Sequence, residues 1–593
     1  MQLETLDWIF IIAYFFTVIA VGLLVVRVAG KDSGQFFLGG RQMPWWLLGF
    51  SMVATTFSTD TPNLVTDIVR QNGVAGNWVW WAFLITGMVT VFLFAKLWRR
   101  SEVLTDIEFY ELRYSGKSAA FLRGFRAIYL GVFFNIMIMA SVSLAAIKIG
   151  GVMLGLQPWE SIVWAGIATV IFSSLGGFRG VVFTDCLLFV IAMIGSVAAA
   201  YFAIGHADIG SLSALFDHPN VADKLSFLPP TGGDAAASEQ NLNLWMTLII
   251  IPLVVQWWSV WYPGAEPGGG GYVAQRMLAA KDEKNATGAV LFFNFAHYGL
   301  RPWPWILVAL ASLVVFPTLD DIQAAFPGLD PSTIGHDLAY PAMLTFLPHG
   351  WLGLVLASLV AAYMSTISTH LNWGSSYIAN DFYKRFMNPE ASEKQLVTVG
   401  RISTVIMMIL AGLLALQLQN ALDTFQILLQ VGAGTGLIFM LRWFWWRINA
   451  FSELSAMIAS FVFAVAFRTI EHGMAWWMEL ILSVGLTTAV WLTVTLITPA
   501  SDEEVLKSFY KKVHPGGSGW KPIRKLLGDS VGPSESLAPQ IGSMLMGTFA
   551  VYGFLFGIGK IVYGSTLTGI VLLIIAAMLG YKIISAQRSS EAS

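Results

Sequence analysis

The stretch LLGFSMVATTFSTDTPNLVTDIVRQNG, residues 47–73, is long enough to cross a membrane and is interrupted at its centre. A membrane-spanning helix needs about 20 mostly apolar residues. The central segment TTFSTDTPN instead gathers β-branched and polar side chains around Pro62. Proline removes a backbone donor and disfavours helix just before it. Such a break is tolerated in a membrane where the freed carbonyls line a polar cavity, so the stretch predicts a broken membrane helix beside a cavity.

A second stretch, LIIIPLVVQWWSVWYPGAEPGGGGYVAQRM at residues 248–277, shows the same disruption, with three prolines and four successive glycines. The two broken segments are the second and the seventh predicted helices, five places apart, so they enter the membrane from opposite sides. Broken helices at matching places in two five-helix halves are typical of inverted-repeat transporters with a binding site at the membrane midplane. The alternative is a pair of ordinary proline kinks.

The composition agrees with a polytopic membrane protein. Of the 593 residues, 56% are hydrophobic and 12% are charged, whereas soluble domains carry about 25% charged residues. The single cysteine, Cys186, excludes an internal disulfide framework and any metal site built from cysteines alone. The formal net charge of −2 gives no reason to expect a nucleic acid partner. The acidic N-terminus MQLETLDWIF lacks the basic region of a signal peptide, so its apolar run is interpreted as a retained helix.

The apolar runs predict an all-α protein with about fifteen transmembrane helices. The predicted helices lie near 5–27, 44–70, 76–98, 122–155, 159–175, 180–205, 242–263, 284–316, 338–380, 397–419, 422–446, 449–469, 473–498, 541–561 and 564–585. Lysine and arginine gather in alternate loops, such as 99–121 and 499–540, while the loop 317–337 contains neither. Because positive loops stay on the cytoplasmic side, we expect the inner (plasma) membrane, with the N-terminus outside and the C-terminus inside.

Several segments together resemble the sodium:solute symporter family, which includes sodium-coupled sugar, proline and sialic acid transporters. They are DWIFIIAYF, FFLGGRQMPWWLLGFSMVATTFS, LGGFRGVVFTDCLLF, YVAQRMLAAKD and AAYMSTISTHLNWGSSYIANDFYKR. The resemblance implies a LeuT-type core of two inverted five-helix repeats, with extra helices outside it. The implied organisation is 1–43 for an N-terminal helix and inner loop, 44–206 for the first repeat, 242–446 for the second, and 447–593 for C-terminal helices.

The segment AAYMSTISTHLN, residues 361–372, supplies hydroxyls for a coupling ion. Ala362, Ser365, Thr366 and Thr369 follow the helical spacing i, i+3, i+4 and i+7 and so share one face. Sodium, like calcium and magnesium, prefers oxygen ligands. The resemblance implies that the Ala362 carbonyl and the Ser365 and Thr366 hydroxyls form a first sodium (Na+) site with the Ala54 and Phe57 carbonyls. Back-bonding of the hydroxyls to their own helix is the structural alternative.

The resemblance also implies a candidate second sodium site, in which Ser368 and Thr369 face Asp185. An aspartate inside a spanning segment is costly unless it is paired or acts as a ligand. Asp185 alternatively anchors the inner loop through Arg179, so the sequence leaves open whether one or two ions are coupled.

The solute is expected between the two breaks, where polar and aromatic side chains gather. Aromatic faces beside hydrogen-bonding groups suit sugar rings and also cations, although any single tryptophan is more often part of an interfacial belt. The candidate solute residues are Asp60, Thr61, Asn63, Trp80, Trp81, Gln256, Trp258, Trp261, Tyr262, Glu266, Arg301 and Gln430.

Two features depart from the family pattern. The segment WYPGAEPGGGG is longer and richer in glycine than the corresponding break in the sugar transporters, which weakens any transfer of contacts there. Arg301 lies in an otherwise apolar helix, and a buried guanidinium needs an anion. It either pairs with Asp60 or Glu266, or receives an acidic solute through two parallel hydrogen bonds.

These observations predict a sodium-coupled symporter for a small polar solute, favouring a sugar or sugar acid. Sodium-coupled symport of an amino acid or other carboxylate is an alternative, and so is a proton-coupled variant with Asp60 or Asp185 as carrier. The chain is not expected to be an enzyme, since it contains neither H-E-x-x-H nor G-x-S-x-G, and GAGTG at 432–436 does not follow a strand. The expected partners are the solute and the lipid bilayer, with a monomer as the working expectation.

Overall fold

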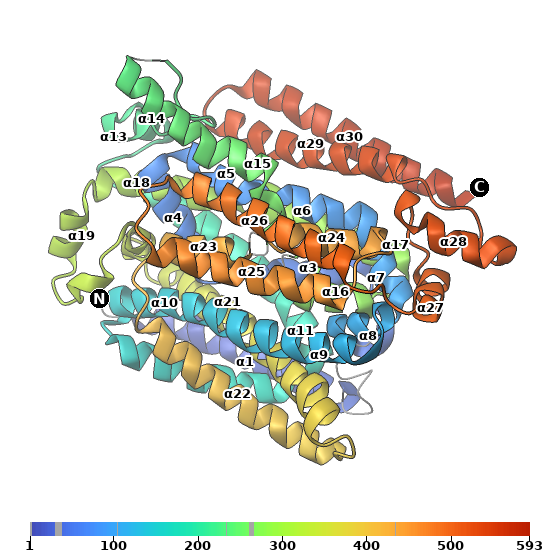
Figure 1. The fold of residues 1–593 in the computed structure, drawn as a ribbon. Coiled ribbons are helices and arrows are strands. Elements are labelled where there is room, and N and C mark those ends of the chain that lie inside the picture. The colour runs from blue at the N-terminus through green and yellow to red at the C-terminus, as the bar shows by residue number, and fades with distance from the viewer. Residues whose placement is uncertain are drawn as a thin grey trace.

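The computed structural model describes residues 3–29, 38–103, 105–232, 234–259, 266–432 and 434–592. Within these ranges every regular element is a helix, and one isolated bridge joins Met43 to Ala280. The long helices run roughly parallel, from left to right in Figure 1. The N-terminus lies at one end of this bundle and the C-terminus at the other (Figure 1).

The first part of the chain contains α1 (Thr5–Ala29) and the helices up to residue 204. They are α3 (Trp45–Thr56), α4 (Asp60–Asn72), η2 (Val74–Asn77), α5 (Trp78–Trp81), α6 (Phe83–Val89), η3 (Thr90–Phe94), α7 (Ala95–Ser101), α8 (Phe109–Arg113), α9 (Gly116–Ile128), η5 (Tyr129–Phe134), α10 (Asn135–Leu154) and α11 (Pro158–Ile204). The π-helical segments η3 and η5 continue the helices on either side of them.

The predicted break in the second membrane helix is present. Helix α3 ends at Thr56, where Phe57 leaves the helical region with φ −84° and ψ 78°. Helix α4 starts at Asp60, so Pro62 lies in its first turn. A proline there costs little, because the first N–H groups of a helix have no partner within the helix. Phe57, Ser58 and Thr59 therefore form the connection between the two helices.

The second part contains the helices from residue 235 to residue 444. They are α14 (Ala235–Trp245), η6 (Met246–Ile250), α15 (Ile251–Val254), η7 (Gln256–Trp258), α16 (Gly271–Ala279), α17 (Glu283–Asn294), η8 (Phe295–Leu300), α18 (Pro302–Val315), α19 (Leu319–Ala325), η10 (His336–Leu338), α20 (Ala339–Leu344), α21 (Trp351–Ser376), η11 (Tyr377–Met387), α22 (Glu393–Ala415), α23 (Ala421–Gly432) and α24 (Gly436–Phe444). The helical run from α14 ends at Trp258, ahead of Pro263, and residues 260–265 lie outside the described ranges.

Two predicted boundaries are wrong. The predicted helices 159–175 and 180–205 are described as one helix, α11, because Gly176 and Gly177 keep their backbone N–H groups, unlike proline, and do not end the helical hydrogen bonding. The predicted helix 338–380 is instead two helices, α20 and α21. They separate where Pro348 and Gly350 follow each other closely, and Gly350 has a φ of 90° that favours glycine.

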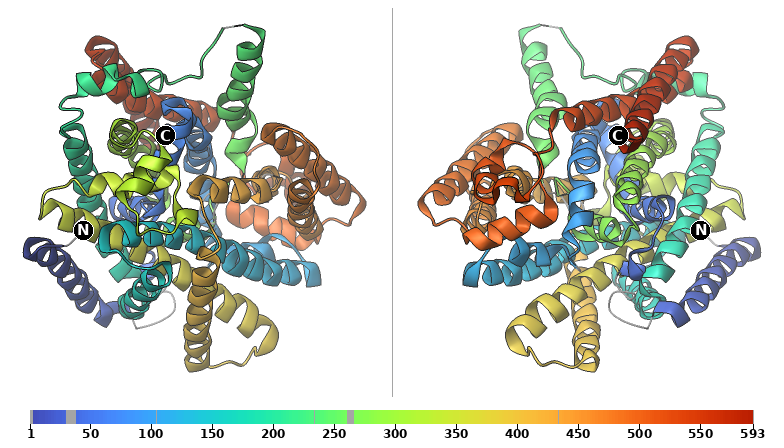
Figure 2. Two further views of the ribbon diagram at one scale, coloured as in Figure 1. Left: turned by 90° about the vertical axis from the view of Figure 1, so that its left-hand side faces the viewer. Right: turned by 90° about the vertical axis from the view of Figure 1, so that its right-hand side faces the viewer.

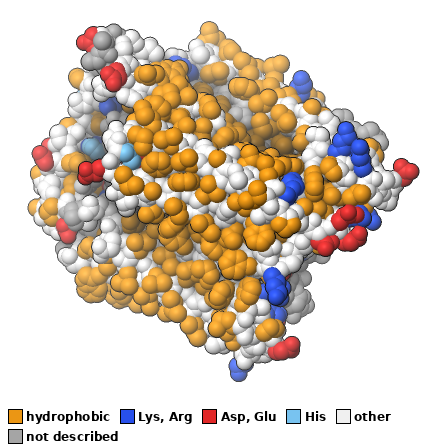
Figure 3. All heavy atoms as spheres, in the orientation of Figure 1, with side chains coloured by type: hydrophobic (Ala, Val, Ile, Leu, Met, Phe, Trp, Pro, Cys, Tyr) orange, Lys and Arg blue, Asp and Glu red, His pale blue; other side chains and the backbone are white. Residues whose placement is uncertain are grey.

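The last part adds α25 (Ala450–Thr469), α26 (Trp476–Ile497), α27 (Glu503–Val513), α28 (Lys521–Leu527), α29 (Ala538–Val562) and α30 (Thr566–Ala592). Among the described residues, ten helices are long and apolar enough to cross a membrane, and two shorter apolar helices accompany them, so the predicted count of about fifteen stays a prediction. Hydrophobic side chains cover the middle of the face shown in Figure 3, while most charged ones gather at its two edges. This is the surface of a polytopic membrane protein.

Candidate functional site

A cavity of about 80 Å³ lies at the break between α3 and α4. Residues from the connection, α10, η8, α21 and α23 surround it. Its lining consists of Thr55, Thr56, Ser58, Asp60, Thr61, Leu64, Val65, Trp80, Ile138, Ser141, Val142, Tyr272, His297, Tyr298, Thr366, His370 and Leu428. Of the predicted solute residues, the structure brings Asp60, Thr61 and Trp80 together here, with Thr366 of the predicted sodium site.

The polar groups in the cavity wall are neutral, apart from the Asp60 carboxyl group. The Ser141 hydroxyl donates to Asp60 Oδ2 at 3.3 Å. His297 Nδ1 lies 3.2 Å from the Thr56 hydroxyl. His370 Nδ1 lies 2.7 Å from Asn135 Oδ1, and the Asn135 amide donates to the His370 carbonyl at 2.8 Å. These contacts hold the two imidazoles in place at the cavity.

Aromatic rings close one side of the cavity. Trp80 stacks on Tyr298, with ring centroids 5.9 Å apart and an interplanar angle of 26°. His297 meets both rings edge-on. Tyr272 packs edge-on against His370 at 6.1 Å. Aromatic faces beside neutral donors and acceptors suit the alternating C–H and O–H surfaces of a polyol.

Sequence reasoning missed His297, Tyr298, Tyr272, Ser141 and His370 as cavity residues. The sequence offered a signal for His297 and Tyr298, because these polar residues interrupt the same apolar helix as Arg301. None existed for Ser141 and Tyr272, since single hydroxyls are common in membrane helices. His370 follows the hydroxyl-rich segment, and only the packing of α21 against α10 shows that it faces the cavity.

The predicted first sodium site lies beside the cavity, where α21 meets the end of α3. The Thr366 hydroxyl donates to the Thr55 carbonyl at 3.1 Å. The Phe57 N–H donates to the Val53 and Ala54 carbonyls at 2.8 and 3.0 Å. Ala54, Phe57 and Ala362 are all buried. The structure thus brings the hydroxyl face of α21 to the end of α3 at the break.

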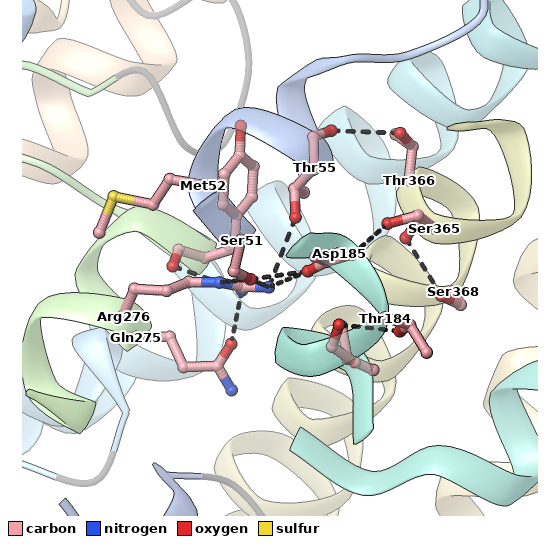
Figure 4. A network of polar contacts seen from close by, with 12 residues as sticks. Ser51, Met52, Thr55, Thr184, Asp185, Gln275, Arg276, Ser365, Thr366 and Ser368 are labelled. Carbon is pink, nitrogen blue, oxygen red and sulfur yellow. Dashed lines mark hydrogen bonds and ion pairs between the residues drawn. The ribbon is translucent and has the colours of Figure 1, made fainter. Parts of the chain in front are cut away.

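Asp185 of α11 connects three helices next to these hydroxyls (Figure 4). Ser365 of α21 and Ser51 of α3 each donate to its carboxylate at 2.6 Å. Arg276 of α16 lies 3.9 Å from the same carboxylate and donates to the Ser51 hydroxyl at 3.2 Å. The cluster therefore joins one carboxylate, one guanidinium and two hydroxyls in the interior of the bundle.

The predicted division of the hydroxyls between two ion sites stays a prediction, and the hydrogen bonds of these hydroxyls do not follow it. Ser365, assigned to the first site, is the α21 hydroxyl that bonds Asp185, while Ser368 donates to the Ser365 carbonyl at 3.1 Å. The helical pitch puts Ser365 at the level of Asp185, and back-bonding within the turn takes up Ser368. The Thr369 hydroxyl is buried and has no hydrogen-bond partner in the described part of the chain. Ser51 was not anticipated.

Other predicted solute residues lie away from the cavity. The Gln256 amide donates to the Val79 carbonyl at 2.6 Å, and the Gln430 amide donates to Glu479 at 2.9 Å. Asn63, Trp81 and Trp258 are not among the described residues that line the cavity. Trp81 packs on Trp78 and Phe556. Trp261 and Tyr262 lie outside the described residues.

Glu266, one of the alternative partners suggested for Arg301, pairs with other arginines. Glu266 is buried in an ion-pair cluster with Arg126 and Arg442, which compensate its charge at that depth. Arg301 instead donates to the Val53 carbonyl at 3.2 Å and to the Thr56 hydroxyl at 3.4 Å. Its guanidinium also lies over the rings of Phe57 and Trp305. Arg301 therefore braces the end of α3 from outside the cavity.

Comparison with known proteins gives consistent results. The family model described as the sodium:solute symporter family matches residues 36–460. A sodium/glucose cotransporter of Vibrio parahaemolyticus is 26% identical over 522 residues, which cover 85% of this chain and 92% of the relative. Sodium/glucose cotransporter 1 of Oryctolagus cuniculus is 24% identical, covering 77% of this chain and 70% of the relative.

A solved structure shares the fold. A Na+-coupled sialic acid symporter in a substrate-bound outward-open state superposes with a TM-score of 0.62 at 19% identity, covering 84% of this chain and 100% of that chain. The predicted all-helical LeuT-type architecture and the resemblance noted in the sequence are confirmed.

Proposed function

Because the chain belongs to the sodium:solute symporter family, we propose that it carries a neutral sugar or similar polyol into the cell together with sodium. One observation carries the choice of solute: the cavity at the α3–α4 break combines stacked aromatic rings with neutral hydrogen-bonding groups and one carboxylate. An acidic solute would meet Asp60 there, whereas Arg301 binds backbone outside the described lining. A sugar is therefore favoured over a sugar acid or another carboxylate.

The first sodium ion is proposed to bind the Ala54, Phe57 and Ala362 carbonyls and the Ser365 and Thr366 hydroxyls. The hydrogen bond between the Thr366 hydroxyl and the Thr55 carbonyl supports this, because it already places α21 against the end of α3. A neutral oxygen cage holds sodium without trapping it, as a transport cycle requires.

A second ion is proposed at Asp185, with Ser365 and Ser51 as the hydroxyls that reach it and Ser368 and Thr369 one turn further on. Asp185 also faces Arg276, so pure structural anchoring is the competing role. The alternative coupling ion, a proton on Asp60 or Asp185, uses the same geometry.

The proposed cycle is alternating access. Sodium binds across the contact between α3 and α21 and favours the state in which the cavity is shaped for the solute, since a ligand shifts a conformational equilibrium only through differential affinity. Each charge moved through 100 mV supplies about 2.3 kcal/mol, or roughly fiftyfold accumulation. A second ion would square that factor.

We further propose an inner-membrane location, with the N-terminus outside and the C-terminus in the cytoplasm, and a monomeric unit organised as the domains given above. The position of basic residues at one end of the bundle supports the orientation. The basic residues of α27 and α28 lie at the end of the bundle opposite the N-terminus (Figure 1), and the positive-inside rule assigns that end to the cytoplasm.

Uptake into proteoliposomes tests the proposal. We expect D-glucose to enter under an inward sodium gradient, D-glucuronate to enter at least tenfold more slowly, and a proton gradient alone to drive neither. Arg301→Gln should leave the preference for the neutral sugar unchanged. Faster uptake of glucuronate than of glucose, lost in Arg301→Gln, would instead support an acidic solute, and uptake at full rate without sodium would support proton coupling.

A further inference from the structure

A second pocket, of about 300 Å³, lies beside the outer end of α4. Six of its lining residues carry neutral hydrogen-bonding side chains: Gln71, Asn72, Gln240, Asn243, Thr247 and Gln426. The remaining five, Ile68, Gly76, Val79, Leu244 and Leu248, are apolar or glycine. The lining that the structure describes contains no charged residue.

Two helical faces form most of this pocket. Gln240, Asn243, Leu244, Thr247 and Leu248 follow the spacing i, i+3, i+4, i+7 and i+8 along α14 and η6, so they share one face. Helix α14 stands at the margin of the bundle, and both views of Figure 2 show it from the side as the green helix that projects from the other helices. Amides on a helix face are costly against lipid and gain little in an apolar core. This face is therefore suited to a wet pocket.

The opposite face belongs to α4 and continues into the central cavity. Thr61, Leu64 and Val65 line the central cavity, and Ile68, Gln71 and Asn72 line the second pocket. Successive steps of three or four residues keep all of them on one side of the helix. The distance from Thr61 to Asn72 along the axis is about 16 Å at 1.5 Å per residue. One stripe of α4 thus connects the two sites.

In two of these side-chain amides, one polar atom is hydrogen-bonded to the protein and the other is available to a ligand. The Gln71 amide nitrogen donates to Asp67 at 2.5 Å. The Asn243 amide oxygen accepts from the Trp477 indole at 3.3 Å. Within the described residues, the Gln71 amide oxygen and the Asn243 amide nitrogen have no such partner. One acceptor and one donor are therefore oriented but uncommitted.

The chemistry of this lining selects its ligand. An amide offers both donors and an acceptor, and each hydroxyl of a polyol does the same, so the two surfaces match. A charged solute would exchange its hydration shell for groups without compensating charge. We infer that the pocket between α4 and α14 is an external subsite that binds a neutral polyol before it moves along α4 into the central cavity.

The inference rests on the proposed function for the solute class and for the outward orientation. It is tested by cysteine protection in intact cells, in a Cys186→Ser background that keeps all six polar side chains of the pocket. Leu244→Cys places a thiol in the pocket wall, and Leu242→Cys places one on the exposed side of the same helix, where the leucine is 59% exposed. Both are reacted with a membrane-impermeant methanethiosulfonate in the absence of sodium.

We expect D-glucose to slow modification at position 244 by the factor 1 + [L]/Kd, which is about fivefold at four times Kd. Modification at position 242 should not change, and D-glucuronate should protect neither position. Protection should persist with Asp60→Asn, which disables the central cavity, and should vanish with Gln240→Ala and Asn243→Ala together.

Unchanged modification at position 244 at every glucose concentration up to the solubility limit would overturn the subsite. So would protection that disappears with Asp60→Asn, because glucose would then act only through the central cavity. Glucose uptake by the Cys186→Ser parent is measured in parallel. Loss of protection with uptake intact refutes the subsite alone, whereas protection without sodium-driven uptake refutes the proposed function alone.

Discussion

Asp185→Asn separates ion binding from structural anchoring. The substitution keeps the shape of the side chain and removes one buried negative charge. The hydrogen bonds from Ser51 and Ser365 each contribute about 1.5–3 kcal/mol to stability when the acceptor is charged. With a neutral acceptor each contributes about 0.5–1.5 kcal/mol. Removing a buried ion-pair partner costs about 3–5 kcal/mol in full, but Arg276 lies 3.9 Å away and still donates to Ser51. We therefore expect a loss of stability of about 2–3 kcal/mol.

The effect on coupling is larger if Asp185 holds a sodium ion. With two ions, a potential of 100 mV supports roughly 2,500-fold accumulation, and with one ion roughly fiftyfold. Asp185→Asn should therefore reduce accumulation at that potential by about fiftyfold. The sodium dependence of initial uptake should fall from a Hill coefficient of about two to about one.

The assay is glucose uptake into proteoliposomes at a potassium-clamped potential, with sodium as the variable. The double variant Asp185→Asn with Arg276→Gln is the matched control, since it removes both charges and leaves no uncompensated guanidinium. It should remain at a coefficient of about one. A single variant that keeps the wild-type coefficient, or a double variant that regains it, would refute the ion site and assign Asp185 to anchoring Arg276.

Three further predictions concern the scaffold. Lys148 is fully buried and its amino group lies 2.5 Å from Asp337. Lys148→Met should therefore destabilise the protein by about 3–5 kcal/mol, as measured by thermal unfolding. The double variant Lys148→Met with Asp337→Leu should recover most of that lost stability. Burial raises the pKa of Glu535, but the hydrogen bond and charge of Lys96 and the charge of Arg100 outweigh it and hold the pKa below its usual 4.5. Its stabilisation should therefore be present above pH 4.5 and lost as the pH falls through the lowered value, so acidification in that range should lower the melting temperature of wild type more than that of Glu535→Gln. A Cβ at Gly436 would lie 1.5 Å from the Trp258 carbonyl oxygen, whereas a Cβ at Gly485 would meet nothing within 4 Å. Gly436→Ala should therefore abolish the monodisperse peak in gel filtration, and the control Gly485→Ala should keep that peak.

The sequence predicted the fold where chemistry is local. Pro62 and the polar residues before it located the break in the second helix, because a missing donor and β-branched residues act on their own segment. The same kind of reasoning placed the hydroxyl face of α21. It overlooked the separation of α20 and α21, although Pro348 and Gly350 are local signals of the same kind.

The site was less predictable because it depends on which helices meet. Glu266 was expected at the solute and is instead compensated by Arg126 and Arg442, two residues far from it in sequence. His297, Tyr298 and His370 reach the cavity only through the packing of η8 and α21 around α3. Ser51 joined the Asp185 cluster for the same reason. The periodicity of the sequence shows which residues share one face of a helix. It does not show which other helix packs against that face.

The significance of GAGTG also became clear only in the structure. As a motif it was weak evidence for a nucleotide site. In the fold, Gly434 contacts Thr487 of α26, and Gly436 lies against the Trp258 backbone where the second broken helix ends. These glycines allow α24 to approach the break closely, which is a packing role.

The central claim is that sodium drives transport through the contact between α21 and the unwound end of α3. Its most direct test is sodium-dependent glucose uptake by Thr366→Val, which removes the hydroxyl that meets the Thr55 carbonyl and keeps the side-chain shape. Thr404→Val, which loses a hydroxyl bonded only to its own helix at Gly400, is the control. The account predicts that Thr366→Val raises the sodium concentration needed for half-maximal uptake at least tenfold. Thr404→Val should leave that concentration unchanged. An unchanged sodium requirement in Thr366→Val would contradict it.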